Sequence, residues 1–271
     1  LFSLSNLFIL KRLNAKVKPK IVIIGTGIGG MSCLKYIYKL SDLVDIVVID
    51  KNKKIRTGPF SNLVIANMLS LDKITFQIEK KKYKNVKFIY SDVKAIDSEK
   101  KIVKLSSDIA VPFDFIILSP GISYKENVIE GYKTSNEYVI PHCWDGDSNI
   151  SRFKKELENL DSYSKIVISS PDYPYRCPPA PYERASLIAN FLKKKNVKFK
   201  ILIFDSKNSF TKQENFFKEW KLYYKDLIEW IPRNKGGKVV FYDHKSSLIK
   251  NERGDSFKAD FINIIPDQKA S

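Results

Sequence analysis

A run of glycines near the start of the chain has the spacing of a nucleotide-binding turn. Residues 25–30 read Gly-Thr-Gly-Ile-Gly-Gly, the pattern G-x-G-x-x-G, and Asp50 follows 20 positions after Gly30. In such a turn Gly25 reverses the chain, Gly27 admits a pyrophosphate to the backbone, and Gly30 lets the next helix close on the strand. The helix start favours an anion, and Asp50 would bind a ribose. The pattern predicts FAD or NAD without a 2′-phosphate; the alternative is a glycine-rich turn that binds no ligand.

The segments around this turn have the apolar patterns needed to position it. Lys20–Gly25 and Val44–Ile49 are continuous apolar runs, typical of strands buried on both faces, and Gly30–Leu40 between them has helical spacing. Phe113–Ser119 is another buried run, and Ser119-Pro120-Gly121 closes it with a turn whose glycine lets the backbone pass close to a cofactor. These segments predict a βαβ unit that carries a dinucleotide.

The same order of elements recurs later, but with a different loop. Lys165–Ser169 and Lys200–Phe204 read as buried strands, with a helix at Tyr182–Lys194 between them and Asp205 at the end of the second strand. The loop at residues 169–181 contains five prolines and no glycine. Proline has no N–H to donate to a phosphate. We therefore expect the second βαβ unit to bind no NAD(P)H.

The fold class predicted from these patterns is α/β, with two tandem Rossmann-like, three-layer domains and a C-terminal truncation. The predicted limits are an export-signal remnant at 1–19, an FAD-binding domain at 20–125, a second NAD-like domain at 126–255, and a return strand to the FAD domain at 256–271. The remaining predicted elements are helices at 69–82, 151–159 and 216–224, strands at 86–90, 239–242 and 261–265, and a three-strand meander at 93–96, 102–105 and 110–112.

Composition limits the partners and cofactors of the chain. It has 47 basic and 30 acidic residues, a net charge of +17, but the lysines are scattered and no nucleic-acid motif occurs. Three cysteines and two histidines are too few for a disulfide framework or a His-rich metal site. Leu1–Leu10 is apolar and too short to span a bilayer. It is similar to the core of a signal peptide, and the alternative is an edge strand or a frayed terminus.

One stretch has a more specific pattern than the glycine turn. Residues 176–185 read RCPPAPYERA, and shorter matches occur in order at 61–65, 141–144, 257–260 and 263–270. From about Lys20 onward the chain resembles the flavoprotein subunit of flavocytochrome c sulfide dehydrogenase. The resemblance implies FAD, a periplasmic (exported) location, a c-type cytochrome partner, and electron transport from sulfide through the flavin to haem.

The resemblance also implies roles for individual residues. Cys177 would be one half of a redox-active disulfide that hydrosulfide attacks, and Glu183 an acid/base beside it. The alternatives are a buried, apolar Cys177 and a Glu183 that only stabilises the start of a helix. The full set of candidate cofactor-binding residues is Gly25, Gly27, Gly29, Gly30, Asp50, Lys51, Asn62, Val93, Ser119, Pro120 and Gly121.

The chain departs from the family pattern at two points. Family members often link FAD through the cysteine of a T-C-x-x-S-N stretch, and here Gly58 stands in its place, so we expect non-covalent FAD. The second cysteine of the disulfide would lie beyond Ser271. Two alternative functions follow: a sulfide:quinone-type or other FAD-dependent sulfur or thiol oxidoreductase, and a non-catalytic flavin-binding subunit.

Overall fold

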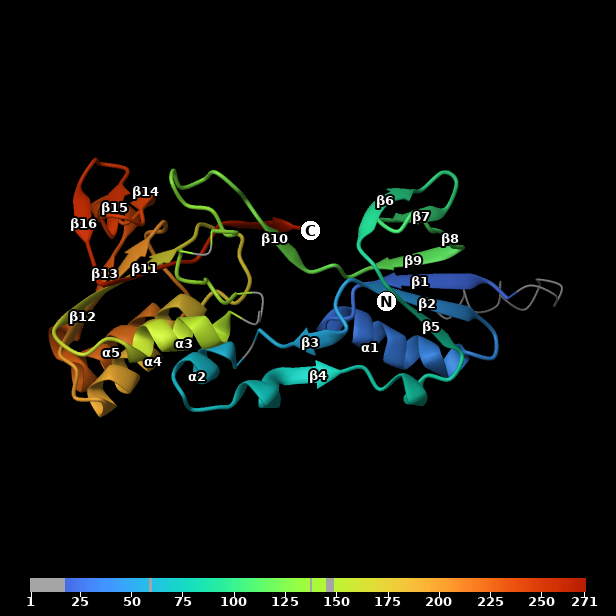
Figure 1. Ribbon diagram of the computed structural model, residues 1–271, viewed down its shortest axis with the longest axis horizontal. Helices are drawn as coiled ribbons and strands as arrows, with labels where there is room; N and C mark the ends of the chain where they lie inside the picture. Colours follow the sequence, from blue (N-terminus) through green and yellow to red (C-terminus); the bar gives the residue numbers. More distant parts are fainter. Residues whose placement is uncertain (1–17, 59, 137, 145–148) are drawn as a thin grey trace. The chain divides into compact units, whose positions relative to one another are not determined.

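The structure is a computed structural model that describes residues 18–58, 60–136, 138–144 and 149–271. The described chain divides into two compact units, shown with their elements in Figure 1. Unit 1 comprises the described residues up to Ile55 together with Gln77–Gly121, and unit 2 comprises Arg56–Phe76 and Ile122–Ser271. The predicted export-signal remnant at 1–19 lies almost wholly outside the described residues.

A parallel four-stranded sheet forms the centre of unit 1. Its strands lie in the order β5-β2-β1-β9, and all neighbouring pairs are parallel. Their bounds are β1 (Lys20–Ile24), β2 (Asp45–Asp50), β5 (Val86–Tyr90) and β9 (Phe115–Leu118). The predicted strands are confirmed. The inner strands β1 and β2 consist of apolar runs because both faces of the sheet are covered.

Different layers cover the two faces of this sheet (Figure 1). Helix α1 (Ile28–Ile37) lies on one face, where Leu34 packs with Ile23 and Val48. A three-stranded antiparallel sheet of β6 (Val93–Asp97), β7 (Ile102–Leu105) and β8 (Ala110–Pro112) covers the other, where residues such as Val103 and Phe113 pack against Val22. Because successive side chains of a strand point to opposite faces, Val22 and Ile23 belong to different cores. The predicted meander is confirmed.

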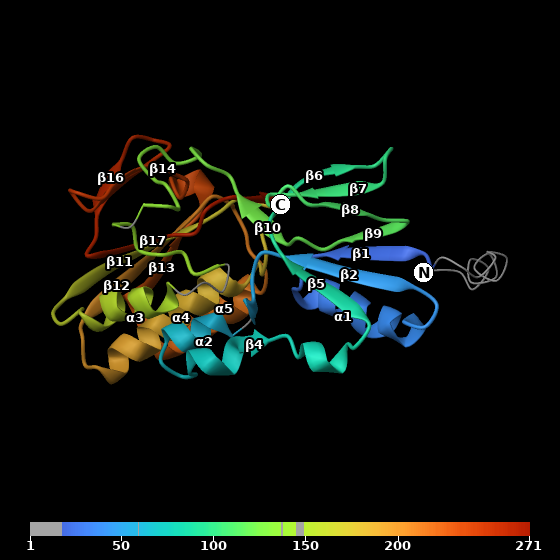
Figure 2. The same ribbon diagram turned by 45° about the vertical axis from the view of Figure 1, so that its right-hand side comes forward.

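Unit 2 has the same layers, as Figures 1 and 2 both show. Its parallel sheet has the order β13-β12-β11-β17. The strands are β11 (Ser164–Ser170), β12 (Phe199–Asp205), β13 (Ile228–Ile231) and β17 (Phe261–Ile264). One face carries the helices α2 (Ser61–Ile65), α3 (Ile150–Glu158), α4 (Ala180–Lys194) and α5 (Gln213–Tyr223). The other carries the antiparallel strands β14 (Val239–Asp243), β15 (Leu248–Asn251) and β16 (Ser256–Lys258).

The predicted α/β class with two three-layer, Rossmann-like domains is therefore confirmed. The shorter elements are β10 (Ile122–Tyr124) paired with β18 (Gln268–Ala270), and β3 (Lys54–Arg56) paired with β4 (Thr75–Gln77). The single-turn 3₁₀ helices are η3 (Tyr38–Leu40), η4 (Leu71–Ile74), η5 (Lys80–Lys82), η6 (Lys225–Leu227) and η7 (Arg233–Lys235). Among the described residues, no helix is both long and apolar enough to cross a bilayer.

The helix predicted at 69–82 is wrong. That segment forms η4, β4 and η5 in succession. The spacing of Ile74 and Ile78 is that of one helix face, but Ile74 is buried in the core of unit 2 whereas Ile78 belongs to unit 1. The segment passes from unit 2 to unit 1 between these two residues, so they do not share one helix face. The β-branched and aromatic residues at 74–76 also favour an extended backbone.

The two compact units divide the chain at other positions than the predicted domain limits, and residues 122–125 already belong to unit 2. Arg56–Phe76 belongs to unit 2, although the sequence predicts it within the first domain. Residues 256–271, predicted as a return strand, also belong to unit 2. The reason is the register of β17, where Phe261 lies beside Ile166 of β11, so that this strand completes the second sheet.

The glycines of the turn generate a prediction about stability. A Cβ added at Gly30 would lie 1.8 Å from the carbonyl oxygen of Gly25, whereas a Cβ at Gly27 would meet nothing within 4 Å. Gly27 has φ −65°, which any residue adopts. We expect Gly30→Ala to lower the free energy of unfolding by about 1–3 kcal/mol, and Gly27→Ala, its matched control, to change it by less than about 0.5 kcal/mol.

Urea denaturation of the two variants, each in its flavin-free form, checks this prediction. Equal stabilities for Gly30→Ala and Gly27→Ala would show that the helix does not lie against the turn as described.

Candidate cofactor and thiol sites

The glycine turn of unit 1 lies between the ends of three parallel strands. The N–H of Gly25, directly after β1, donates to Ile49 O of β2 at 2.8 Å, and the N–H of Ser119 donates to Ile24 O at 2.8 Å. Gly25 has φ +97°, and a Cβ there would lie 2.0 Å from Ser119 O. The turn at Ser119–Gly121 therefore packs directly on the glycine turn, and only glycine fits at position 25.

The open side of this turn matches what a dinucleotide needs. Gly27 is exposed and has no neighbour in the space where a side chain would be. Helix α1 begins at Ile28, so the first N–H groups of the helix have no intrahelical acceptor and lie next to this space. Partial positive charge and an open backbone together form a cradle for a pyrophosphate, so the residues of unit 1 fit an FAD or NAD adenylate.

Asp50 lies at the end of β2, beside the turn. Its Oδ2 accepts hydrogen bonds from the N–H and the hydroxyl of Thr26, both at 2.7 Å, and its Oδ1 accepts from the N–H of Asn52 at 2.7 Å. A carboxylate has about four acceptor positions. These three hydrogen bonds hold the Asp50 carboxylate in one orientation. About one of its acceptor positions is left, and it suits a ribose hydroxyl.

Three further residues of unit 1 are predicted to contact the cofactor: Gly29, Lys51 and Val93. A Cβ at Gly29 would meet the Ser119 hydroxyl oxygen at 2.6 Å. Lys51 is exposed, with its Nζ 4.0 Å from a carboxylate oxygen of Asp92. Val93 is half-buried at the start of β6 and packs against the core between the two sheets of unit 1. Cofactor contacts at these positions stay predictions.

Unit 2 carries the thiol. Cys177 is exposed, has φ +61°, and its carbonyl oxygen accepts from the N–H of Ala180 at 3.0 Å, just before helix α4. Burial raises the pKa of the Cys177 thiol and the charge of Glu183 raises it further, while the amide of Ala180 and the Arg176 guanidinium oppose them. Cys143 is buried and Cys33 is half-buried.

Glu183 lies in the first turn of α4, exposed and close enough to Cys177 to influence its pKa. Its Oε2 accepts a hydrogen bond from the side-chain amide of Asn62 at 2.7 Å. The same amide nitrogen donates to Ala180 O at 3.1 Å, and Asn62 Oδ1 accepts from Nε of Arg184 at 3.0 Å. The sequence predicts Asn62 as a cofactor contact; in the structure both donors of its amide are used inside unit 2.

Arg184, to which the sequence patterns give no role, is fully buried. Its Nη1 donates to His142 O at 2.6 Å and to Asn263 Oδ1 at 2.7 Å, and its guanidinium lies 4.9 Å from the centre of the Trp144 ring. Burial lowers the pKa of Arg184 to about 10. The only sequence signal for it is its place within the stretch at 176–185.

Unit 2 also has an aspartate at the end of its second parallel strand, Asp205 of β12. Unlike Asp50, Asp205 is enclosed by side chains of its own unit. Asp205 is fully buried, and its carboxylate accepts from the Tyr182 hydroxyl at 2.5 Å, Trp230 Nε1 at 2.8 Å and Lys207 Nζ at 2.6 Å. Lys207 Nζ also donates to Ser170 Oγ at 2.9 Å and Pro171 O at 2.6 Å. Burial lowers the pKa of Lys207, and Asp205 opposes that shift. All three ammonium protons of Lys207 are thus used in hydrogen bonds. The Lys207 side chain therefore closes the end of β11 in the same unit.

This arrangement predicts a large cost for removing the lysine. Lys207→Met would leave the Asp205 carboxylate buried without its cation, so we expect the free energy of unfolding to fall by about 3–5 kcal/mol. The matched control is Lys200→Met, which removes the ion pair with Glu229 at 2.8 Å and the exposed hydrogen bond to Asp226 O at 2.6 Å, and it should cost about 1 kcal/mol. Urea denaturation followed by tryptophan fluorescence measures both. Equal losses for the two variants would contradict a closed, charged pair at the end of β11.

Two three-layer units, of which the first carries a complete dinucleotide turn, define the class of FAD/NAD(P)-dependent oxidoreductases. Residues 19–168 match the family model of the pyridine nucleotide-disulphide oxidoreductases, and the chain belongs to this family. Residues 151–266 match the model of the central part of the sulfide dehydrogenase [flavocytochrome c] flavoprotein chain. The predicted resemblance to that flavoprotein is thus confirmed.

Solved structures share the fold at low identity. The sulfide:quinone oxidoreductase of Aquifex aeolicus is 17% identical with a TM-score of 0.70, and the match covers 92% of this chain and 58% of that one. NDH2 of Plasmodium falciparum in complex with NADH is 16% identical with a TM-score of 0.69, over 94% and 56%. An NAD-dependent persulfide reductase of A. fulgidus is 14% identical with a TM-score of 0.68, over 92% and 46%. The chain spans about half the length of these relatives.

Proposed function

We propose that the chain is the FAD-binding and thiol-bearing part of an oxidoreductase that takes electrons from sulfide and passes them to a c-type cytochrome. The observation that carries the proposal is the contrast between the two strand-end acids. Asp50 stands beside an open glycine turn, whereas Asp205 is closed by Lys207. Because Lys207 closes the strand end where a second dinucleotide would bind, unit 2 argues against NAD(P)H as the electron donor. The exposed Cys177 of the same unit is the alternative point of entry for electrons.

The cofactor in this proposal is FAD, held by Gly25, Gly27, Gly30 and Asp50 through its adenylate half. When bound, FAD supplies the two-electron acceptor that can release electrons one at a time to a haem. The attachment is non-covalent because Gly58 has no side chain to form a bond. A Cβ at Gly58 would lie 3.3 Å from the guanidinium of Arg176, the residue before Cys177. Position 58 therefore lies next to the loop that carries Cys177.

The thiol chemistry in this proposal is an exchange at a disulfide of which Cys177 is one half. Hydrosulfide forms a bond to one sulfur, the bond between the two cysteine sulfurs breaks, and the second cysteine leaves as a thiolate with the electron pair. The second cysteine is the one that the resemblance places after Ser271. Glu183 lies beside Cys177 and would accept the proton of the incoming sulfide.

A flavin and sulfide assay tests this proposal. The full-length protein should show a flavin spectrum that sulfide bleaches under anaerobic conditions. Gly27→Ala should weaken FAD binding at least about tenfold, which is about 1.4 kcal/mol, because its methyl group occupies the open space at the turn. Acid precipitation should release all flavin into the supernatant.

Each result has a contradicting outcome. A colourless protein from cells replete with riboflavin, or full FAD binding by Gly27→Ala, would contradict the assigned cradle. A yellow protein that sulfide does not bleach would favour the non-catalytic flavin-binding subunit. Flavin in the acid pellet would contradict non-covalent attachment, and bleaching followed by reduction of quinone in place of cytochrome c would favour the sulfide:quinone-type alternative.

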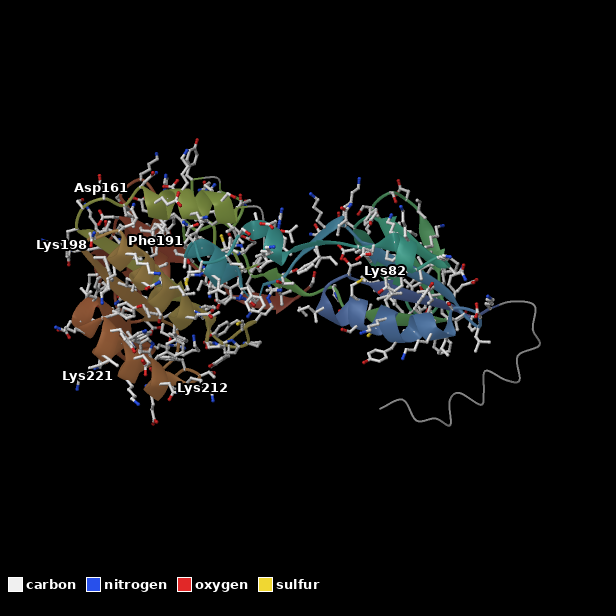
Figure 3. The ribbon with its side chains drawn as sticks, turned by 90° about the horizontal axis from the view of Figure 1, so that it is seen from below. Lys82, Asp161, Phe191, Lys198, Lys212 and Lys221 are labelled. Atoms are coloured by element: carbon white, nitrogen blue, oxygen red, sulfur yellow. The ribbon has the colours of Figure 1, made fainter. Side chains whose placement is uncertain are left out.

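The proposed partner is an acidic c-type cytochrome, and the proposed location is periplasmic, by export. The net charge is +17, and lysines such as Lys198, Lys212 and Lys221 lie exposed on unit 2, where Figure 3 shows them at the surface. Opposite charge speeds association, and salt screens it.

The rate of association with the cytochrome should therefore fall at least about tenfold between roughly 10 mM and 200 mM salt. Stopped-flow measurement of cytochrome reduction at limiting protein concentration checks this. A rate that is independent of ionic strength would contradict electrostatic docking.

A further inference from the structure

A line of hydrogen bonds runs through unit 2 from a buried cation to the exposed acid beside the thiol. Arg184 Nε donates to Asn62 Oδ1 at 3.0 Å, and the Asn62 amide donates to Glu183 Oε2 at 2.7 Å. Arg184 is fully buried and Asn62 is 5% exposed, whereas Glu183 is exposed. The first two residues are therefore fixed by their surroundings, and the third is the one that solvent reaches freely.

The chemistry of the groups fixes the orientation of the amide. A guanidinium has only donors, so Asn62 must present its oxygen to Arg184. The amide nitrogen then faces the other way, toward Glu183 Oε2 and Ala180 O, and a carboxylate is an acceptor for it. Turning the amide by 180° would place donors against donors and oxygen against carboxylate. The orientation of Asn62 is thus determined by Arg184.

The guanidinium is itself held by three separate segments. Besides Asn62 of α2, its acceptors are His142 O in a loop and Asn263 Oδ1 of β17, at 2.6 and 2.7 Å. Its Nη2 has no hydrogen-bond partner among the described residues. The three acceptors fix the position of the guanidinium, and with it the position of the Asn62 oxygen.

We propose that Asn62 and Arg184 are positioning residues that hold the Glu183 carboxylate in one place beside Cys177. The inference rests on the proposed function in that Cys177 is taken as the reactive thiol. Without the Asn62 amide, Glu183 would be an exposed side chain free to rotate into solvent.

The thiol itself reports the position of the carboxylate. The groups that act on Cys177 are burial and the charge of Glu183, which raise the pKa of the thiol, and the Ala180 amide and Arg176, which lower it. A carboxylate that stays in place adds to the effect of burial and raises the pKa of the thiol further. A carboxylate that moves away removes this contribution, so the pKa of the thiol falls and more of it is thiolate, which is the species that alkylating reagents attack.

The experiment measures iodoacetamide alkylation of Cys177 in the reduced full-length protein between about pH 6 and 10, with the site read by mass spectrometry. Glu183→Gln should react about threefold faster than wild type at pH 7. Asn62→Ala should be faster in the same direction. The acceleration that Glu183→Gln causes should fall from about threefold to about one when Asn62 is also replaced, because the two changes act on one contact.

A second variant and a control keep the result clear. Asn62→Asp retains the acceptor for Arg184 but presents a like charge to Glu183, so it should abolish the acceleration by Glu183→Gln even if Asn62→Ala does not fold. Ser186 lies on the same helix as Glu183 and accepts a hydrogen bond from Trp220 Nε1 of α5 at 2.8 Å. Ser186→Ala removes this acceptor and should leave the acceleration by Glu183→Gln unchanged.

An acceleration by Glu183→Gln that stays near threefold in both Asn62 backgrounds would overturn the proposal. The assay requires neither flavin nor sulfide. Failure of the positioning role is therefore distinguishable from failure of the proposed sulfide oxidation.

Discussion

The buried guanidinium of Arg184 is the constraint on which the arrangement of unit 2 depends. A cation removed from water must be compensated by hydrogen bonds, and here the acceptors at its Nε and Nη1 are neutral oxygens from α2, the loop at His142, and β17. Trp144 and Phe153 add their rings at 4.9 and 5.4 Å. Because these acceptors come from segments far apart in the sequence, the cation can be satisfied only when all of them are assembled.

This constraint also explains the domain limits. The segment at 56–76 precedes the second half of unit 1 in sequence, yet Asn62 is the acceptor for Arg184, and Val64 and Ile65 pack in the core of unit 2. Unit 2 thus takes from the first half of the chain the residue that contacts Glu183. The thiol site therefore combines two residues, Asn62 and Glu183, that are 121 positions apart in the sequence.

The two units use one topology for different purposes. Each has an aspartate at the end of its second parallel strand. In unit 1, Gly27 leaves the backbone open beside Asp50, and the carboxylate orients the turn through Thr26. In unit 2, a lysine two positions after Asp205 fills the equivalent place and donates to Ser170 and Pro171. The Lys207 ammonium group and its three acceptors therefore close the strand end in unit 2, whereas the strand end in unit 1 stays open.

Local patterns determined most of the fold and part of the site. Continuous apolar runs predicted the central strands of both sheets, and G-x-G-x-x-G with Asp50 predicted the cradle, because these depend on neighbours in sequence. The segment at 69–82 failed because Ile74 and Ile78 have helical spacing but belong to different units. The sequence by itself also placed Glu183 at a helix start and Cys177 in the proline-rich loop before it. Only the tertiary structure decided that Asn62 faces Glu183, that Arg184 orients it, and that Lys207 closes the second unit, because burial and long-range hydrogen bonds exist only once distant segments are packed together.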